Sequence, residues 1–210
     1  MGGGFVESTL RQGGARPGLI LIETIYWDGR AAPRWPLHAA RLRRSALSLG
    51  WAEPRPDAPQ GPDHPARLRL TLNRAGELRL ELHPLPPGKT EWRIGLAAER
   101  LSSADPWLSV KSSNRRLHDQ ARAALPPDLD ELIFLNERGE LAEGTITSLF
   151  FDRGAGMRTP PLSSGALPGV LRAELNCPEE VLRAEDLPLL RRLWVGNALR
   201  GLIPAVFTAG

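Results

Sequence analysis

The chain has 210 residues, is 41% hydrophobic and carries a formal net charge of +3 at pH 7. This is enough apolar material for one large or two small globular domains, and no apolar run reaches the roughly twenty residues that a membrane span requires. The arginines are spread among nearly as many acidic residues, without a basic run or interleaved aromatics, which argues against a nucleic-acid-binding protein. The glycine-rich start carries no secretion signal, so we expect a cytoplasmic protein.

The first elements predict a strand followed by a helix. Residues 19–27 are apolar and β-branched, and the strand that they predict ends at the turn pair Asp28–Gly29. From Pro36 onward, leucines and alanines fall on one face with arginines opposite, which predicts an amphipathic helix that Gly50 closes. Residues 52–66 then form a proline-rich loop.

A hairpin and a break in periodicity follow. Two alternating strands surround the turn Asn73–Gly76, and their pattern predicts a hairpin whose faces separate arginine from leucine. The stretch 83–90 is rich in proline and breaks all periodicity, which marks a domain boundary. We therefore predict a smaller α/β domain over 1–88 and a larger domain over 89–210.

The second half mixes strands and helices without strict alternation, which favours the α+β class. The single cysteine, Cys177, excludes an internal disulfide, and no cluster with metal-ligand spacing accompanies it. The predicted elements are a strand over 92–97, a helix over 114–124, two strands around the turn Asn136–Gly139, a helix over 168–175 and a strand region over 193–207.

Lysine is rare in this sequence. Of the 27 basic residues only Lys89 and Lys111 are lysines, so nearly every position that needs only a positive charge holds arginine. Lysine differs from arginine in having a primary amine that, once deprotonated, attacks a carbonyl. Lys89 lies in a Pro/Gly loop, where a solvated charge is a sufficient explanation. Lys111 is therefore the candidate nucleophile, and a surface charge is the alternative.

Several stretches carry a family resemblance. Lys111, NERGELAEGTITSLFF (136–151), TPPLSSGALPGVLR (159–172) and NALRGLIP (197–204), together with LIETI and HAARLRRSA in the first half, resemble the class IV aminotransferase family of pyridoxal-phosphate enzymes, called fold type IV. Within it they are most similar to the 4-amino-4-deoxychorismate lyases. The resemblance covers about residues 19–207. It implies two α/β domains with the cofactor, pyridoxal 5'-phosphate, between them, and a homodimer.

The resemblance also implies roles for single side chains. Lys111 falls where the family keeps its Schiff-base lysine, and Arg41 matches the arginine on the cofactor phosphate. Glu143 matches the acid that pairs with the pyridine nitrogen and keeps it protonated. Thr24, in the ET pair, is a further candidate proton donor beside Lys111.

Two further segments match the family's phosphate site. In LPGVLR, Val170 and Leu171 would contribute backbone N–H groups, and Gly169 would permit close approach of the phosphate. Asn197 and Ala198 fall where the family closes the other side of this site. No metal is implied.

The sequence departs from the family in three places. Residues 1–18 replace the usual first strand and loop, and LIET stands in place of FET. Ser148 occupies a position where asparagine is usual. No residue clearly matches a substrate-carboxylate arginine; the candidates are Arg69, Arg74 and Arg115.

Three functions are compatible with this pattern. The first is a lyase that splits 4-amino-4-deoxychorismate into 4-aminobenzoate and pyruvate on the route to folate, with a small-molecule substrate that an aminodeoxychorismate synthase would supply. The second is an aminotransferase for a D- or branched-chain amino acid, which would use the same Lys111 and Glu143. The third is a non-catalytic relative, for which the atypical N-terminus and Ser148 are the arguments. Retention of lysine at position 111 argues against that third alternative.

Overall fold

The structure is a computed structural model that describes residues 3–208, with side chains from Glu7 onward. It divides into two compact units. Unit 1 comprises Met1–Pro87 and Ser109–Asn114, and unit 2 comprises Gly88–Leu108 and Arg115–Gly210. The predicted division had assigned Lys111 to the second domain, whereas the structure places it in unit 1. The reason is local pairing, because the backbone N–H of Ile22 donates to the Lys111 carbonyl at 3.0 Å.

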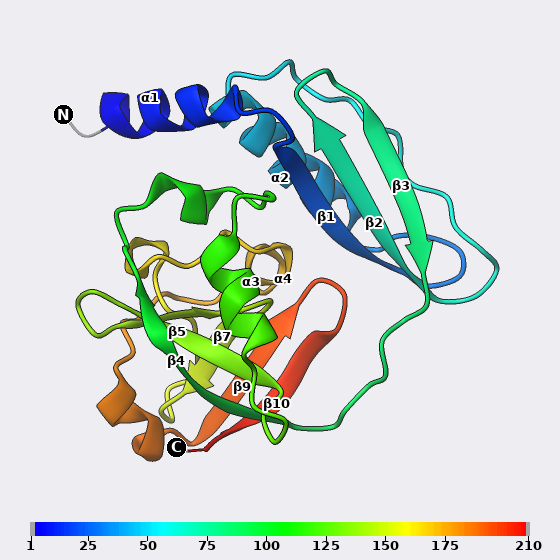
Figure 1. Cartoon of the computed structure of the whole chain (residues 1–210). Coiled ribbons are helices and arrows are strands. Elements are labelled where there is room, and N and C mark those ends of the chain that lie inside the picture. The colour runs from blue at the N-terminus through cyan, green and yellow to red at the C-terminus, as the bar shows by residue number, and fades with distance from the viewer. Residues whose placement is uncertain (1–2, 209–210) are drawn as a thin grey trace. The chain divides into compact units, whose positions relative to one another are not determined.

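Unit 1 is a small antiparallel sheet with a helix on one face. The strand order is β1-β2-β3. Alternate residues of β1 are buried, and they face α2, as the amphipathic pattern of that helix predicts (Figure 1). Its elements are α1 (Gly3–Gly14), β1 (Ile20–Trp27), α2 (Trp35–Ser48), β2 (Ala66–Asn73) and β3 (Leu78–His83).

The boundaries of these elements follow from local chemistry. Pro36 lies in the first turn of α2, where a missing N–H costs nothing, and Gly50 stops the helix with φ of 71°. The loop between α2 and β2 is held by Trp27, whose indole N–H donates to the Pro62 carbonyl at 2.7 Å. Helix α1 was not predicted, because its glycines have low helix propensity. Its last residue, Gly14, accepts a hydrogen bond from the Trp51 indole at 2.8 Å.

Unit 2 is built on a mixed sheet of order β6-β5-β4-β10-β9-β7-β8. Strand β6 also pairs with β7, so the pairings from β6 through β5, β4, β10 and β9 to β7 form a closed ring. Strand β4 pairs in parallel with β5 and β10, and the other pairs are antiparallel. The strands are β4 (Trp92–Leu101), β5 (Glu131–Asn136), β6 (Leu141–Gly144), β7 (Ser148–Asp152), β8 (Met157–Arg158), β9 (Arg192–Asn197) and β10 (Gly201–Phe207). The helices are η1 (Pro106–Ser109), whose last residue is in unit 1, α3 (Arg116–Ala123), η2 (Leu162–Ser164), α4 (Val170–Leu175) and η3 (Ala184–Leu189).

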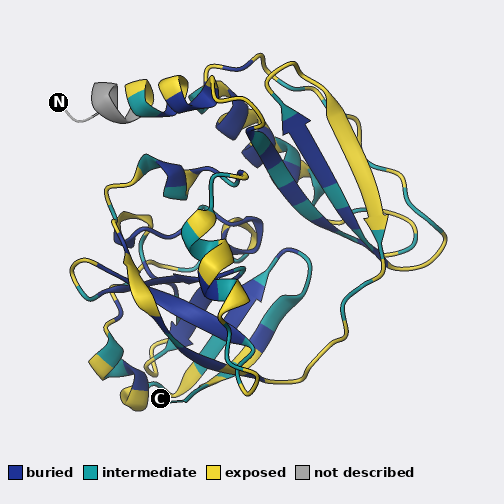
Figure 2. Ribbon diagram, in the orientation of Figure 1, coloured by how far each residue is buried: buried dark blue, intermediate teal, exposed yellow. Residues whose placement is uncertain are grey.

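The core of unit 2 lies among these strands, where Phe134, Phe150 and Phe151 are fully buried (Figure 2). Two predicted strand regions are each divided. The region after the Asn136–Gly139 turn becomes β6 and β7, and the last region becomes the hairpin of β9 and β10. The α+β class is confirmed. Within residues 3–208, no helix is long and apolar enough to cross a membrane.

Candidate active site

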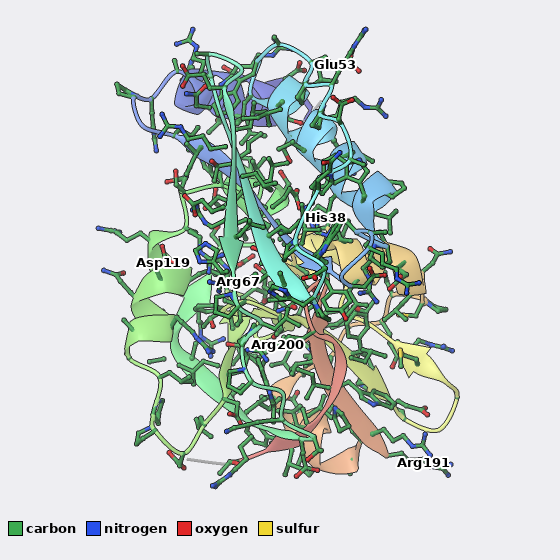
Figure 3. The ribbon with its side chains drawn as sticks, turned by 90° about the vertical axis from the view of Figure 1, so that its right-hand side faces the viewer. His38, Glu53, Arg67, Asp119, Arg191 and Arg200 are labelled. Carbon is green, nitrogen blue, oxygen red and sulfur yellow. The ribbon has the colours of Figure 1, made fainter. Side chains whose placement is uncertain are left out.

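In unit 1, one carboxylate binds two side chains of α2. Glu23 lies on the buried face of β1, and its carboxylate accepts hydrogen bonds from His38 Nδ1 at 2.6 Å, Arg41 Nε at 2.8 Å and Arg41 Nη2. His38 and Arg41 are three residues apart on α2, so they project from the same face of the helix (Figure 3 shows His38). All three side chains are buried.

Electrostatics keeps this carboxylate ionised. Burial alone would raise the pKa of Glu23, but the charge of Arg41 and the hydrogen bonds from His38 and Arg41 outweigh burial and lower the pKa to about 2. Two of the three guanidinium nitrogens of Arg41, Nε and Nη2, donate to Glu23. The predicted role of Arg41 on the cofactor phosphate would have to use the remaining nitrogen, Nη1.

Lys111 is tied to β1 through its neighbours. In addition to the bond between Lys111 O and Ile22, the Ile20 N–H donates to the Ser113 hydroxyl at 3.2 Å, and Ser112 forms an isolated bridge with Leu21. The segment is therefore fixed along the edge of the unit 1 sheet. Lys89 has a structural role, because its Nζ atom forms an ion pair with Asp130 Oδ1 at 2.6 Å.

Thr24 belongs to the opposite face of this sheet from Glu23, since successive strand residues alternate. On that face Thr24 is in register with Arg69, and Tyr26 is in register with Arg67 on β2. The Arg67 Nε atom is buried and has no hydrogen-bond partner among the described residues. A buried guanidinium donor without a partner suits an anionic ligand.

The three predicted candidate arginines differ in what they already bind. Arg69 makes only a long contact of 3.5 Å with Glu81, and Arg74 lies in the exposed β2–β3 turn. Arg115 is committed to Asp119 at 2.7 Å and to the Thr145 carbonyl at 2.8 Å. Arg67 was not among the predicted candidates, although it alternates with leucines on β2 as Arg69 does, because the sequence does not show which of the two has a buried donor without a partner.

In unit 2, Glu143 on β6 is a buried carboxylate with two donors. His118 Nε2 on α3 lies 2.9 Å from Oε1, and the Leu167 backbone N–H donates to Oε2 at 2.8 Å. His118 packs against Phe134, with ring centroids 4.9 Å apart. His118 was not predicted as a site residue, since a single histidine on a helix rich in arginine gives no sequence signal.

A second buried carboxylate, that of Glu131, binds the loop after Glu143. Glu131, at the start of β5, accepts the backbone N–H groups of Thr145 at 3.0 Å and Ile146 at 3.1 Å. The hydroxyl groups of Thr145 and Thr147 also donate to it, the latter at 2.9 Å. Gly144 has no room for a side chain, because a Cβ there would lie 2.8 Å from the Glu131 carboxylate and closer still to Thr147.

The two predicted phosphate segments lie together in unit 2. Helix α4 packs on β9, where a Cβ on Gly196 would come within 2.6 Å of the Leu171 side chain. A Cβ on Gly169 would lie 2.9 Å from the Ser148 hydroxyl. Ser148 in turn is in register with both Glu143 and Gly196. These segments and the acid therefore form one continuous surface.

The start of α4 offers candidate backbone donors for the predicted phosphate site. The first N–H groups of α4, those of Val170 and Leu171, have no acceptor within the helix, and the absence of a side chain at Gly169 lets the Ser148 hydroxyl lie close to this backbone. Asn197 makes structural contacts, and its place beside the phosphate stays a prediction. Its Oδ1 accepts the Leu199 and Arg200 N–H groups at 3.1 and 3.0 Å, so its side chain shapes the β9–β10 turn that also carries the buried Ala198.

The loop that leads into α4 is anchored by buried side chains. Arg172 donates to the Thr159 hydroxyl and to the Pro160 carbonyl, both at 2.6 Å, and also binds Glu179. Ser164 donates to the buried Glu140 carboxylate at 2.8 Å. These hydrogen bonds fix the conformation of the segment TPPLSSGALPGVLR. Several of its residues therefore have a structural explanation and need no chemical role.

Known proteins with similar sequences indicate the family to which this chain belongs. The model of the family described as Amino-transferase class IV matches residues 20–206. The "Putative aminodeoxychorismate lyase" of Schizosaccharomyces pombe (strain 972 / ATCC 24843) is 28% identical over 168 residues, which cover 74% of this chain and 72% of that protein.

Two solved structures are similar. The "Putative amino-acid aminotransferase" from Mesorhizobium loti is 40% identical, with a TM-score of 0.85, over 90% of this chain and 100% of that one. The "Putative 4-amino-4-deoxychorismate lyase" from Legionella pneumophila subsp. pneumophila str. Philadelphia 1 is 21% identical, with a TM-score of 0.71, over 90% of this chain and 82% of that one, and shares the fold. The predicted family is confirmed: this chain belongs to the class IV aminotransferases, a family of pyridoxal-phosphate enzymes.

Proposed function

We propose that this protein is a pyridoxal-phosphate-dependent lyase that converts 4-amino-4-deoxychorismate into 4-aminobenzoate and pyruvate. The observation that carries the proposal is the continuous surface of unit 2, where Glu143, Ser148 and the start of α4 lie together. The Schizosaccharomyces pombe relative, named as such a lyase, supports the choice of reaction.

The family resemblance assigns the proposed cofactor roles residue by residue. The Glu143 carboxylate would pair with the pyridine nitrogen, and the backbone around Gly169, Val170 and Leu171 would hold the phosphate. Lys111 has the primary amine that suits the cofactor's aldehyde, and Arg41 would contribute its remaining nitrogen. Bound pyridoxal phosphate would act as an electron sink for the carbon that loses its proton.

The chain's own groups would then move protons. Lys111 removes the proton from the ring carbon that bears the amino nitrogen. The bond between the ring and the enolpyruvyl oxygen breaks, the ring becomes aromatic, and the departing enolpyruvate takes up a proton from Lys111 or Thr24 to give pyruvate. Arg67 and Arg69, on the same sheet face as Thr24, would bind the carboxylates of the substrate.

A second function has its own support. The Mesorhizobium loti structure, named as an amino-acid aminotransferase, is 40% identical to this chain. An aminotransferase would use Lys111 and Glu143 in the same way, so these two residues do not discriminate. The substrates discriminate between the two functions, since an aminotransferase needs both an amino acid and a 2-oxo acid, whereas the lyase needs one substrate.

Product analysis separates the two functions. The protein with pyridoxal phosphate is incubated with 4-amino-4-deoxychorismate alone, or with D- or branched-chain amino acids and 2-oxoglutarate, and Lys111→Arg serves as the matched control. Equal amounts of 4-aminobenzoate and pyruvate, absent in the variant, support the lyase. Amino transfer without 4-aminobenzoate overturns it in favour of the aminotransferase.

The family resemblance extends the proposal to the protein's setting. The lyase would work in the cytoplasm, in folate biosynthesis, on a small molecule that an aminodeoxychorismate synthase supplies. It would act as a homodimer. Sedimentation and co-purification with the synthase test these two associations.

A further inference from the structure

The carboxylate of Glu143 has one donor on each oxygen. His118 Nε2 on α3 lies 2.9 Å from Oε1, and the Leu167 backbone N–H donates to Oε2 at 2.8 Å. Among the described residues, His118 is the one side chain that binds this carboxylate, and 12% of the histidine side chain and 9% of the glutamate side chain are exposed. An ionised carboxylate only accepts hydrogen bonds, so Nε2 carries the hydrogen atom of this bond whenever Glu143 is ionised.

Helix α3 is attached to unit 2 at both of its ends by other side chains. Arg115, just before the helix, donates to the Thr145 carbonyl at 2.8 Å, and Arg122, in the last turn, donates to the Asp130 carbonyl at 2.7 Å. The helix lies beside β4 and β5 (Figure 1). Because these contacts hold α3, the bond from the histidine is not needed to keep the helix in place. Its effect therefore falls on the carboxylate.

The imidazole of His118 is a donor with a fixed direction. Its ring packs on the fully buried ring of Phe134, with centroids 4.9 Å apart and planes tilted by 57°. A side chain that is locked by packing and by a hydrogen bond holds its partner more accurately than a flexible surface side chain does. The contacts from Phe134 through His118 to Glu143 therefore fix the orientation of the carboxylate.

Loss of this donor would leave Oε1 of Glu143 without a partner. The residue is 7% exposed, so little water reaches its carboxylate. A buried carboxylate oxygen without a donor is unfavourable, so the group would turn toward another donor or take up a proton. Both changes weaken its pairing with a cation, and the predicted cation is the protonated pyridine nitrogen.

We propose that His118 is a positioning residue, which orients the carboxylate of Glu143 toward the pyridine nitrogen of pyridoxal phosphate. Its role rests on the role of Glu143 in the proposed function, and it is the same for the lyase and for the aminotransferase. His118 acts through Glu143 and has no assigned contact with the substrate. Affinity for the cofactor should therefore depend on the donor at position 118.

Two substitutions separate the donor from the ring. His118→Phe keeps an aromatic ring against Phe134 but removes the donor, whereas His118→Gln keeps an N–H donor without the ring. Quenching of tryptophan fluorescence gives the dissociation constant of pyridoxal phosphate for each apoprotein. His118→Phe should raise this constant about tenfold, since a hydrogen bond to a charged group is lost. His118→Gln should stay within about threefold of the wild type.

Controls separate this effect from a general loss of structure. Gln120→Ala, at an exposed position of α3, is the matched control and should leave the dissociation constant unchanged. Urea unfolding shows whether each variant is folded. His118→Leu, which also lacks a donor, takes the place of His118→Phe if that variant does not fold.

A double-variant cycle tests whether His118 acts through Glu143. In a Glu143→Ala background, His118→Phe should change the dissociation constant by less than about twofold, because the acceptor is already absent. The visible band of the bound cofactor should shift in His118→Phe in the same direction as in Glu143→Gln. A histidine with only a structural role would instead give additive losses and an unshifted band.

The outcomes distinguish this role from the proposed function. Additive losses in the cycle, equal losses in His118→Phe and His118→Gln, or a wild-type dissociation constant and band in His118→Phe each overturn the role of His118. In these cases binding of the cofactor by the wild type, and its dependence on Glu143, leave the proposed function intact. A wild type that does not bind pyridoxal phosphate overturns both.

Discussion

Each unit buries a carboxylate beside a histidine, yet the two carboxylates differ in the charge of their partners. Glu23 in unit 1 binds His38 and the guanidinium of Arg41. Glu143 in unit 2 binds His118 and the Leu167 backbone N–H, and neither of these two partners is an arginine or a lysine. Burial is similar, with 2% and 7% of the residue exposed.

We infer from this difference that Glu23 has a structural role and that Glu143 has the functional role proposed above. The charge of Glu23 is balanced inside the fold, so its main effect is to hold α2 on β1. Neither of the two partners of Glu143 is an arginine or a lysine, so we expect its carboxylate to be available to a cation such as a protonated pyridine nitrogen. The comparison predicts that equivalent substitutions will damage stability in unit 1 and activity in unit 2.

Glu23→Gln gives the largest expected loss of stability. Without the carboxylate, Arg41 stays buried as an unpaired charge, so the free energy of unfolding should fall by about 3–5 kcal/mol. Urea unfolding measures this change. The double variant Glu23→Gln with Arg41→Met removes both charges and should recover part of the loss. Equal losses in the single and double variants would show that the ion pair is not the cause.

The same carboxylate predicts an acid limit to stability. The pKa of Glu23 is about 2 in the folded chain against an ordinary value of 4.5. Its contribution is therefore complete above pH 4.5 and is lost as the pH falls toward 2, by about 3 kcal/mol at about 1.4 kcal/mol for each pKa unit. Unfolding free energies measured across this range should fall less steeply in Glu23→Gln than in the wild type.

Glu143→Gln should show the opposite balance. The amide keeps the size of the side chain but removes its charge, so we expect turnover to fall about 10²–10³-fold. The free energy of unfolding should change by about 1 kcal/mol or less, because the lost contacts are ordinary hydrogen bonds. Steady-state kinetics and urea unfolding on one preparation give both values. A large stability loss with little change in turnover would reverse the assignment.

Arg67→Met tests the substrate face of unit 1. The alkyl chain is retained while the unpartnered guanidinium is removed, so stability should be maintained and kcat/KM should fall about 10–100-fold, mainly through KM. Arg74→Met in the exposed turn is the matched control. If both variants behave as wild type, Arg67 does not bind the substrate.

Gly144→Ala tests the packing of the loop after Glu143. A Cβ at this position meets Glu131 and Thr147, so overpacking should cost about 1–3 kcal/mol in unfolding free energy. Gly88→Ala is a suitable control, since a Cβ there has no atom within 4 Å. Equal stability of the two variants would mean that the loop after Glu143 adapts freely.

The sequence predicted the elements better than the partners of the site residues. Periodicity located β1, α2 and the β2–β3 hairpin, because each has a clear apolar face. It did not show that Glu23 would bind Arg41, since this pair forms only when α2 packs on β1. Alternation on β3 likewise separated leucine from arginine, but it did not show that the leucine face would be exposed.

The missed residues share a physical reason. Glu131, His118 and Arg67 are polar residues in patterns typical of surface positions, and each is placed by an element distant in the sequence. A family resemblance assigns roles to motif positions such as Lys111 and Glu143. It does not name the side chains that hold those positions in place.

The absorbance spectrum with pyridoxal phosphate, before and after borohydride, tests the central claim most directly. The wild type should gain a visible band, and borohydride should fix the cofactor to the peptide that contains Lys111, whereas Lys111→Arg should show neither. Glu143→Gln should retain the covalent label with a shifted band, and Glu23→Gln should retain an unshifted band while it stays folded. A wild type that stays colourless in excess cofactor, or a label on Lys89, would contradict the account.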